Sequence, residues 1–270
     1  MTARPHLPAL RDVIKTYGLG AKKSLGQHFL LDTNLTDRIA RAAGDLNGKH
    51  VVEIGPGPGG LTRSILAQAP ASLSVIERDQ RCIDALIELR SVYPDILVLH
   101  EADAMKVTLS EMAPRPTIII SNLPYNVGTA LLIKWLNDLD GIERMVLMFQ
   151  KEVAERVAAP PGSDAYGRLA ILTQWLCEAH ILFNVDKRAF TPPPKVMSAV
   201  IEVIPRKTPL AEAELPKLER VTQAAFGQRR KMLRSSLKSL GINPADAGID
   251  PQRRAEQLTV EEFCALARMI

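Results

Sequence analysis

A four-residue motif, Asn122-Leu123-Pro124-Tyr125, combines groups that could hold a planar base through an exocyclic amino group. The Asn side-chain oxygen and a main-chain carbonyl can accept hydrogens from that nitrogen, while the Tyr ring can stack on the base. Methyl transfer to a base nitrogen requires such groups, because it depends on positioning that nitrogen and the base. Because Asn and Pro are common in turns, an ordinary strand-to-helix turn is the alternative for this motif alone.

The elements that would position this motif form a repeating β-α pattern. The isoleucines at 118–120 predict a buried parallel strand that ends at the motif. Further strands are predicted over 51–54, 72–76 and 96–100, and helices over 61–69, 79–90 and 129–136. This order predicts a mostly parallel sheet, and ligands of such sheets bind at the carboxyl ends of the strands.

The first predicted strand ends in the glycine-rich turn Gly55-Pro56-Gly57-Pro58-Gly59-Gly60. Gly55, Gly57 and Gly60 have the spacing of the dinucleotide pattern G-x-G-x-x-G, but the turn holds an additional glycine, and its prolines lack the N–H donors that a pyrophosphate needs. We therefore expect S-adenosylmethionine, with Glu53 near its positive charge and Gly55 and Gly57 against its amino-acid part. A tight turn without a ligand is the alternative.

The next two predicted strands end in acidic residues. Glu77 lies about 20 residues past the glycines, where an acid can hold both ribose hydroxyls. Asp103 could accept the adenine amino group, and Ala104 leaves room for the ring. Either acid alone could be a solvated strand end or a helix cap. Together with Gly55 and Asn122, however, they place chemistry-bearing residues at four successive strand ends, which predicts one site.

Five sequence blocks, in this order along the chain, resemble the ribosomal RNA adenine dimethyltransferases. They lie at 23–30 (KSLGQHFL), 55–60 (GPGPGG), 122–125 (NLPY), 190–196 (FTPPPKV) and 226–231 (FGQRRK). The later blocks are most similar to the bacterial small-subunit branch of that family, which is linked to kasugamycin sensitivity. Two departures concern fine ligand contacts: His28 stands where many members carry Asn, and Pro58-Gly59-Gly60 replaces more varied residues.

The resemblance implies a Rossmann-like S-adenosylmethionine-dependent methyltransferase fold, with a mostly parallel seven-stranded sheet and a small helical carboxyl-terminal domain. It also implies transfer of two methyls to N6 of each of two adjacent adenosines, in the 3′-terminal hairpin loop of 16S rRNA during assembly of the 30S subunit. S-adenosylhomocysteine is the expected product of the cofactor. The number of methyls and their order do not follow from the sequence itself.

The expected mechanism is direct in-line methyl transfer to the N6 nitrogen of adenine. Asn122 and a carbonyl near Leu123 would orient this nitrogen, Tyr125 would stack on the base, and Phe190 would close the opposite face. A core position is the alternative for Phe190. The expected catalytic residues are Asn122, Leu123, Pro124, Tyr125 and Phe190, and the expected cofactor residues are His28, Leu30, Glu53, Gly55, Gly57, Glu77, Asp103, Ala104 and Asn122.

The positive charge is concentrated at the two ends of the chain. The net charge is +4, yet residues 1–30 hold five Lys or Arg against one acid, and residues 206–254 hold eleven against five. Such segregation indicates an RNA-binding surface, although a charge run can also be a solvated helix face. The expected RNA contacts are Lys22, Lys23, Arg229, Arg230, Lys231 and Arg234.

The spacing of Leu233, Leu237 and Leu240 predicts a helix that buries the face formed by these leucines. The opposite face would carry Arg230, Arg234 and Lys238. Prolines at 205 and 209 mark the best domain boundary. We expect a catalytic domain over 1–205, including the basic amino-terminal segment, and a helical RNA-binding or ribosome-binding domain over 206–270.

Composition narrows the class of protein. Three widely spaced cysteines, Cys82, Cys177 and Cys264, indicate reduced core residues with neither disulfides nor a metal site. No run approaches the roughly 18 apolar residues of a membrane span. A cytoplasmic monomer that acts on the immature 30S subunit is expected. Three other functions stay open: a large-subunit rRNA methylase, a non-catalytic assembly or transcription factor, and a small-molecule N-methyltransferase.

Overall fold

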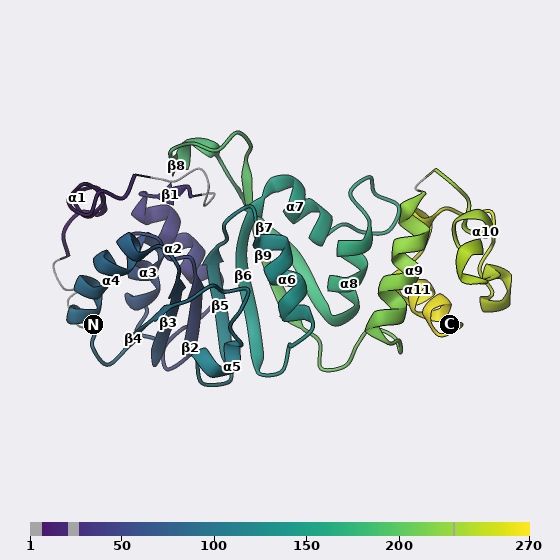
Figure 1. The fold of residues 1–270 in the computed structure, drawn as a ribbon, viewed down its shortest axis with the longest axis horizontal. Coiled ribbons are helices and arrows are strands. Elements are labelled where there is room, and N and C mark those ends of the chain that lie inside the picture. Colours follow the sequence, from purple (N-terminus) through teal and green to yellow (C-terminus); the bar gives the residue numbers. More distant parts are fainter. Residues whose placement is uncertain (1–6, 21–26, 229) are drawn as a thin grey trace. The chain divides into compact units, whose positions relative to one another are not determined.

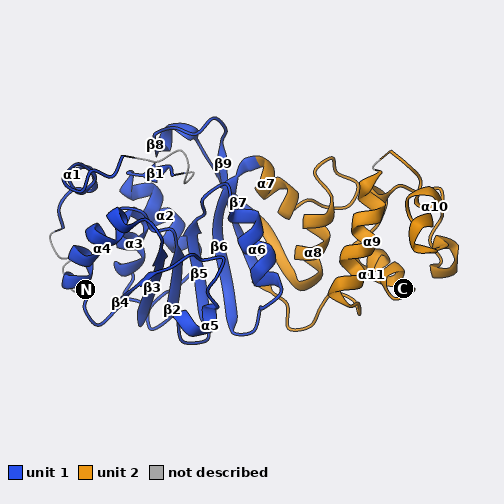
Figure 2. Ribbon diagram, in the orientation of Figure 1, with its two compact units in different colours: residues 1–151, 181–203 blue, residues 152–180, 204–270 orange. Residues whose placement is uncertain are grey.

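The computed structural model describes residues 7–20, 27–228 and 230–270. It contains two compact units: residues 1–151 with 181–203, and residues 152–180 with 204–270 (Figure 2). The boundary expected after residue 205 lies close to the break at 203, but residues 152–180 group with the carboxyl-terminal unit. The reason is that helix α8 (Arg168–Leu176) packs against α9 (Leu215–Gly227) and α11 (Val260–Ala267) within that unit.

A seven-stranded sheet in the order β4-β3-β2-β5-β6-β9-β7 forms the framework of the fold (Figure 1). Neighbouring strands from β4 to β6 pair in parallel, and β9 runs antiparallel to β6. The predicted mostly parallel, seven-stranded sheet is therefore confirmed. The strands are β2 His50–Ile54, β3 Ser72–Glu77, β4 Leu97–Glu101, β5 Thr117–Asn122, β6 Ile142–Gln150, β7 Cys177–Val185 and β9 Ser198–Pro205.

The central strands β2 and β5 are buried because they are built from β-branched residues on both faces. Val51, Val52 and Ile119 are fully buried, as expected for parallel strands covered by helices. Since β2 lies between β3 and β5, the carboxyl ends that carry Gly55, Glu77 and Asn122 are adjacent. The order of the sheet thus brings together the residues that the sequence placed at successive strand ends.

The first unit contains the three helices predicted over 61–69, 79–90 and 129–136, with ends within three residues of the predicted ones, and further helices that no pattern predicted. Asp79 caps α4 by accepting from the Arg81 amide, and Asp32 caps α2 by accepting from the Asn34 amide. These helices are α1 Leu10–Thr16, α2 Thr33–Ala42, α3 Gly60–Leu66, α4 Gln80–Val92, α5 Leu109–Met112, α6 Gly128–Leu136 and the start of α7 Lys151–Val157, with the 3-10 turn η2 Lys187–Ala189.

A second, two-stranded sheet joins residues far apart in the sequence. Strand β1 (Phe29–Leu30) pairs antiparallel with β8 (Phe190–Thr191). We call residues 27–30 the amino-terminal wall, because all four line the pocket described below. The pairing fixes this wall to the segment that carries Phe190.

The carboxyl-terminal unit is helical around an aromatic core in which Phe226 stacks on Phe263 at 5.7 Å between ring centroids. Besides the helices already named it contains α10 Leu233–Ser236 and the 3-10 turns η3 Lys238–Leu240, η4 Pro244–Ala247 and η5 Ala255–Gln257.

The expected continuous helix with a basic stripe up to Leu240 is wrong for the described residues of that segment. Met232 is extended and forms a bridge with Arg254, and the Leu233 amide donates to the Arg253 carbonyl at 2.8 Å. These tertiary hydrogen bonds replace helical ones, so only the short α10 and η3 form. Leu233 and Leu237 are nevertheless buried as predicted.

Within the described ranges no helix is long and apolar enough to cross a membrane, and no group of three or more His, Cys, Asp or Glu could hold a metal ion. The three cysteines are free and buried, which confirms their predicted place in the core.

Candidate functional site

One pocket of the first unit lies at the carboxyl ends of β2, β3, β4 and β5. It collects every expected cofactor residue: His28, Leu30, Glu53, Gly55, Gly57, Glu77, Asp103, Ala104 and Asn122. It also collects Leu123, Pro124 and Tyr125. Phe190 does not line it.

The glycine turn between β2 and α3 has the conformation that its sequence requires. Gly55, Gly57 and Gly59 have positive φ angles of 65°, 56° and 88°, which L side chains rarely adopt. A Cβ atom on Gly57 would come within 3.1 Å of the Phe29 ring, and one on Gly60 within 2.6 Å of the Leu30 carbonyl oxygen. Glycines are therefore needed here for the positive φ angles and also for the close approach of the turn to the amino-terminal wall. The second requirement was not visible in the sequence.

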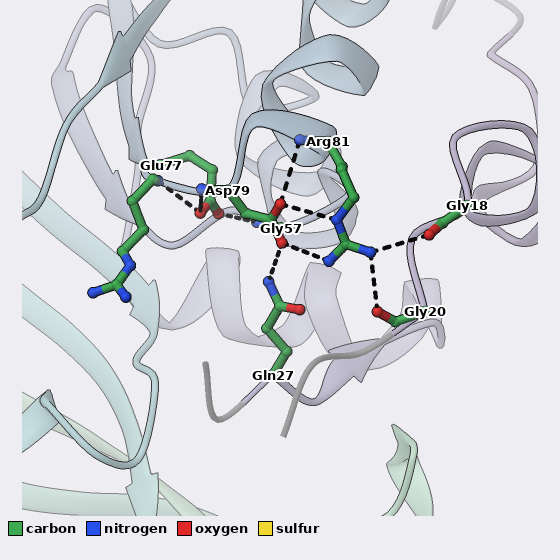
Figure 3. Close-up of polar contacts among 8 residues, drawn as sticks. Gly18, Gly20, Gln27, Gly57, Glu77, Asp79 and Arg81 are labelled. Atoms are coloured by element: carbon green, nitrogen blue, oxygen red, sulfur yellow. Dashed lines mark hydrogen bonds and ion pairs between the residues drawn. The ribbon is translucent and has the colours of Figure 1, made fainter. Parts of the chain in front are cut away.

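Glu77 is a buried carboxylate at the end of β3, held by main-chain donors (Figure 3). One oxygen accepts from the amides of Arg78 and Asp79 at 2.8 and 2.9 Å, and the other accepts from Gly57 at 3.1 Å. Burial raises its pKa, and these three donors oppose the shift. Each oxygen has two lone pairs, so the three amides occupy three of the four acceptor positions, and the oxygen that accepts from Gly57 can still accept a hydrogen bond from a hydroxyl.

Glu53, at the end of β2, is 1% exposed. It accepts a hydrogen bond from the Thr62 hydroxyl at 2.7 Å. Burial raises its pKa to about 8, and the negative charge of Glu77 acts in the same direction. A cation in the pocket would favour the ionised form, which fits the expected place of the sulfonium or ammonium group.

Asp103 and Ala104 belong to the loop after β4. The Asp103 carboxylate accepts from the Met105 amide at 2.9 Å and lies 4.0 Å from the Arg78 guanidinium. Lys134, on α6, donates to the Ala104 carbonyl at 2.8 Å and also to the Val107 carbonyl. No sequence motif pointed to Lys134, and only these hydrogen bonds show that it holds the loop that carries Ala104.

The amide of Asn122 has a defined orientation. Its nitrogen donates to the main-chain carbonyl of His28 at 3.2 Å. Because a carbonyl oxygen can only accept, the NH₂ group must face His28, and the Asn oxygen remains as an acceptor. This is the orientation required to receive a hydrogen from an amino group.

Tyr125 and His28 form the aromatic part of the site. The Tyr125 hydroxyl shares a 2.5 Å hydrogen bond with the buried Ser198 hydroxyl, and the ring centroid lies 5.4 Å from that of His28. Burial raises the pKa of Tyr125. His28 is itself held through Nδ1, which lies 2.8 Å from the Pro192 carbonyl and therefore donates to it.

Phe190 is 2% exposed and packs in the hydrophobic core of the first unit. Its ring meets the His28 ring edge-on at 6.4 Å. The structure therefore gives Phe190 the core position that was the alternative, in contact with His28 and not on the pocket surface. A role as the second face of a base sandwich remains a prediction.

The structure describes three of the six expected RNA contacts. Arg230, Lys231 and Arg234 are exposed in the carboxyl-terminal unit. Lys22, Lys23 and Arg229 fall outside the described residues.

The chain is similar to known proteins over nearly its whole length. The family described as "Ribosomal RNA adenine dimethylase" matches residues 18–270. The chain is 59% identical, over 98% of its length and 95% of the relative's, to a Paramagnetospirillum magneticum protein named "Ribosomal RNA small subunit methyltransferase A". It is 55% identical, over 98% of its length and 93% of the relative's, to a protein of the same name from Rhodospirillum rubrum.

Two solved structures have the same fold. A dimethyladenosine transferase from Plasmodium falciparum aligns with a TM-score of 0.74 and 25% identity, over 88% of this chain and 96% of that one. The 23S rRNA methyltransferase ErmE aligns with a TM-score of 0.71 and 28% identity, over 89% and 98%.

Proposed function

Because the chain belongs to the ribosomal RNA adenine dimethylase family, we propose that it dimethylates N6 of two adjacent adenosines in the 3′-terminal hairpin loop of 16S rRNA. The relatives named "Ribosomal RNA small subunit methyltransferase A", 53–59% identical over nearly the whole chain, support the small subunit as the target. The proposed partner is the immature 30S subunit, and the enzyme acts as a monomer in the cytoplasm.

The observation that carries the chemistry is the orientation of Asn122. With its NH₂ group fixed on the His28 carbonyl, its oxygen can accept one N6 hydrogen of an adenine. A main-chain carbonyl near Leu123 would accept the other. N6 is a poor nucleophile because its lone pair is delocalised into the ring. Accepting both hydrogens favours a pyramidal nitrogen and frees the lone pair for attack, so catalysis depends on positioning and dipoles.

Tyr125 would provide the face on which the target base stacks. Its hydroxyl is held by Ser198, so the ring has a fixed direction before the RNA binds. A flipped or splayed base is commonly held on an aromatic ring in this way.

The pocket residues fit S-adenosylmethionine, which supplies an electrophilic methyl group when bound. Glu77 would hold the ribose hydroxyls, and Asp103 with Ala104 would hold the adenine. Glu53 would lie near the positive charge. Gly55 and Gly57, together with His28 and Leu30 of the amino-terminal wall, would hold the amino-acid part.

The test is the methylation state of rRNA in cells with and without the protein. Mass spectrometry of both ribosomal RNAs should show N6,N6-dimethyladenosine near the 3′ end of 16S rRNA in the wild type, its loss on deletion, and its return with the wild-type gene. An Asn122→Ala gene should not restore it.

The main alternative is a large-subunit methylase, favoured by the structural similarity to ErmE. The same measurement separates the two, because loss of a methylated adenosine from 23S rRNA alone would contradict the small-subunit proposal. No change in either RNA would favour a non-catalytic factor or an enzyme for small molecules.

A further inference from the structure

We propose that Asp79 and Arg81 form a positioning unit that holds the amino-terminal wall against the cofactor pocket. Neither residue lines the pocket. The inference rests on the assignment of that pocket to S-adenosylmethionine, and the experiment below separates failure of one from failure of the other.

Arg81 reaches from the first turn of α4 to a segment more than 60 residues earlier in the chain (Figure 3). One terminal nitrogen of its guanidinium donates to the carbonyls of Gly18 and Gly20, at 3.1 and 3.4 Å. The other terminal nitrogen and Nε donate to Asp79 at 2.7 and 3.1 Å. Two nitrogens of the planar guanidinium thus bind the Asp79 carboxylate, and the third donates to Gly18 and Gly20, which precede the amino-terminal wall in the chain.

Asp79, the acidic partner of Arg81, contacts the amino-terminal wall directly. Its carboxylate accepts from the Gln27 side-chain nitrogen at 3.0 Å. The Asp79 side chain is 4% exposed, and the hydrogen bonds from Arg81 hold its pKa at about 2. The carboxylate therefore remains ionised and able to accept from Arg81 and Gln27 together at every pH at which the protein would be assayed.

The separations of these residues along the chain indicate that the pair positions the amino-terminal wall. Asp79 and Arg81 are two residues apart, so pairing them orders little chain, and Asp79 also caps α4. The contacts to Gly18, Gly20 and Gln27 span 52 to 63 residues. A local ion pair with a fixed geometry thus directs long-range hydrogen bonds to both sides of the segment that leads into the wall.

The same turn also supports the expected ribose site. The Asp79 amide donates to Glu77, which accepts from Gly57 through its other oxygen. The wall is fixed independently to the catalytic motif by the bond from Asn122 to the His28 carbonyl. Loss of the Asp79–Arg81 unit should therefore loosen the retention of the cofactor more than it disturbs the methyl-transfer geometry.

The test compares Arg81→Met with Arg90→Met, a matched control on the exposed side of the same helix. Because Arg81→Met removes every hydrogen bond that this guanidinium donates to Asp79, Gly18 and Gly20, S-adenosylhomocysteine binding should weaken about 10-fold or more. The loss should appear as faster dissociation, with kcat at saturating cofactor within about twofold of the wild type. Arg81→Lys should be intermediate.

Hydrogen exchange at the Phe29 and Leu30 amides gives a direct readout of the wall. In the bound protein it should be faster in Arg81→Met than in Arg90→Met. If Arg81→Met does not fold, Gln27→Leu replaces it in the test, because this variant leaves the Asp79–Arg81 ion pair intact. It should show a smaller loss of S-adenosylhomocysteine binding and a smaller increase in hydrogen exchange at Phe29 and Leu30. Equal dissociation constants for Arg81→Met and Arg90→Met, or a fall in the melting temperature of the free protein with unchanged binding, would overturn the proposal. Failure of the wild type to bind S-adenosylhomocysteine would instead overturn the pocket assignment.

Discussion

The proposed mechanism gives the two ends of the Asn122 amide different partners, because its NH₂ group donates to the His28 carbonyl and its oxygen would accept from N6. Asn122→Ala removes the acceptor for N6 and the donor to the His28 carbonyl. Loss of one preorganised polar contact commonly costs about 100-fold in rate. We expect a fall of about that size in methyl transfer to immature 30S subunits, measured with tritiated cofactor. Cofactor affinity should change less.

Asn184→Ala is the matched control, since Asn184 is exposed on β7 and does not line the pocket. Near-normal turnover by Asn122→Ala would contradict the assignment of this amide.

Glu53 should make the stability of the ligand-free protein depend on pH. Its folded pKa of about 8 lies above the ordinary value of 4.5. Below pH 4.5 the carboxyl is protonated in both states, and its contribution to stability is complete. Between these values only the folded state keeps the proton, so this contribution is lost as the pH rises to about 8. The slope approaches 1.4 kcal/mol per pH unit at most, roughly the value for one proton.

Urea unfolding of the wild type and Glu53→Gln between pH 5 and 9 measures this effect. The free energy of unfolding of the wild type should fall relative to that of the variant as the pH rises. A pH-independent difference between the two proteins would mean that Glu53 titrates normally.

At the scale of elements, the sequence was sufficient for the parallel strands and for the residues at their ends. Runs such as 118–120 are apolar on both faces, and the order of β-α units then fixes where Gly55, Glu77 and Asn122 meet. It was insufficient where long-range hydrogen bonds decide. Strand β1 has two residues and no periodicity, and its partner lies about 160 residues later.

The segment that follows Arg229 shows the same limit. Its leucine spacing is helical, yet the Leu233 amide donates to the Arg253 carbonyl instead of to a helical one. Propensity and pattern are local properties, and such tertiary hydrogen bonds override them. The burial of Leu233 and Leu237 was predictable because it depends on hydrophobicity alone.

The basic segment at 230–234 can be tested as a phosphate-binding element. Replacing Arg230, Lys231 and Arg234 by Gln should weaken binding to immature small subunits. The slope of log affinity against log salt should also decrease by roughly 0.7 to 0.9 per lost phosphate contact. Cofactor affinity should stay unchanged.

The control replaces three exposed arginines elsewhere, Arg41, Arg90 and Arg156, and removes the same total charge. Identical salt slopes for the two triple variants would indicate a general effect of net charge and remove the segment from the RNA surface.

At the scale of the whole molecule, positive charge at both ends of the chain flanks a central part that carries more acids than bases. A folded particle presents phosphates from several parts of the RNA together, whereas an isolated hairpin presents only its own. We expect the protein to bind the immature 30S subunit more tightly than the isolated 3′ hairpin at equal salt. Filter binding with both RNAs measures this, and equal affinities would show that the hairpin alone is recognised.

The pairing of β1 with β8 also has a consequence for the timing of synthesis. A nascent chain that has left the ribosome only as far as β6 already contains the glycine turn, Glu77 and Asn122. It lacks Phe190 and Thr191, to which Phe29 and Leu30 are paired in the finished protein. Closing so long a loop is slow compared with local folding. The binding site of this enzyme is therefore completed late in translation, after most of the residues that line the site have been made.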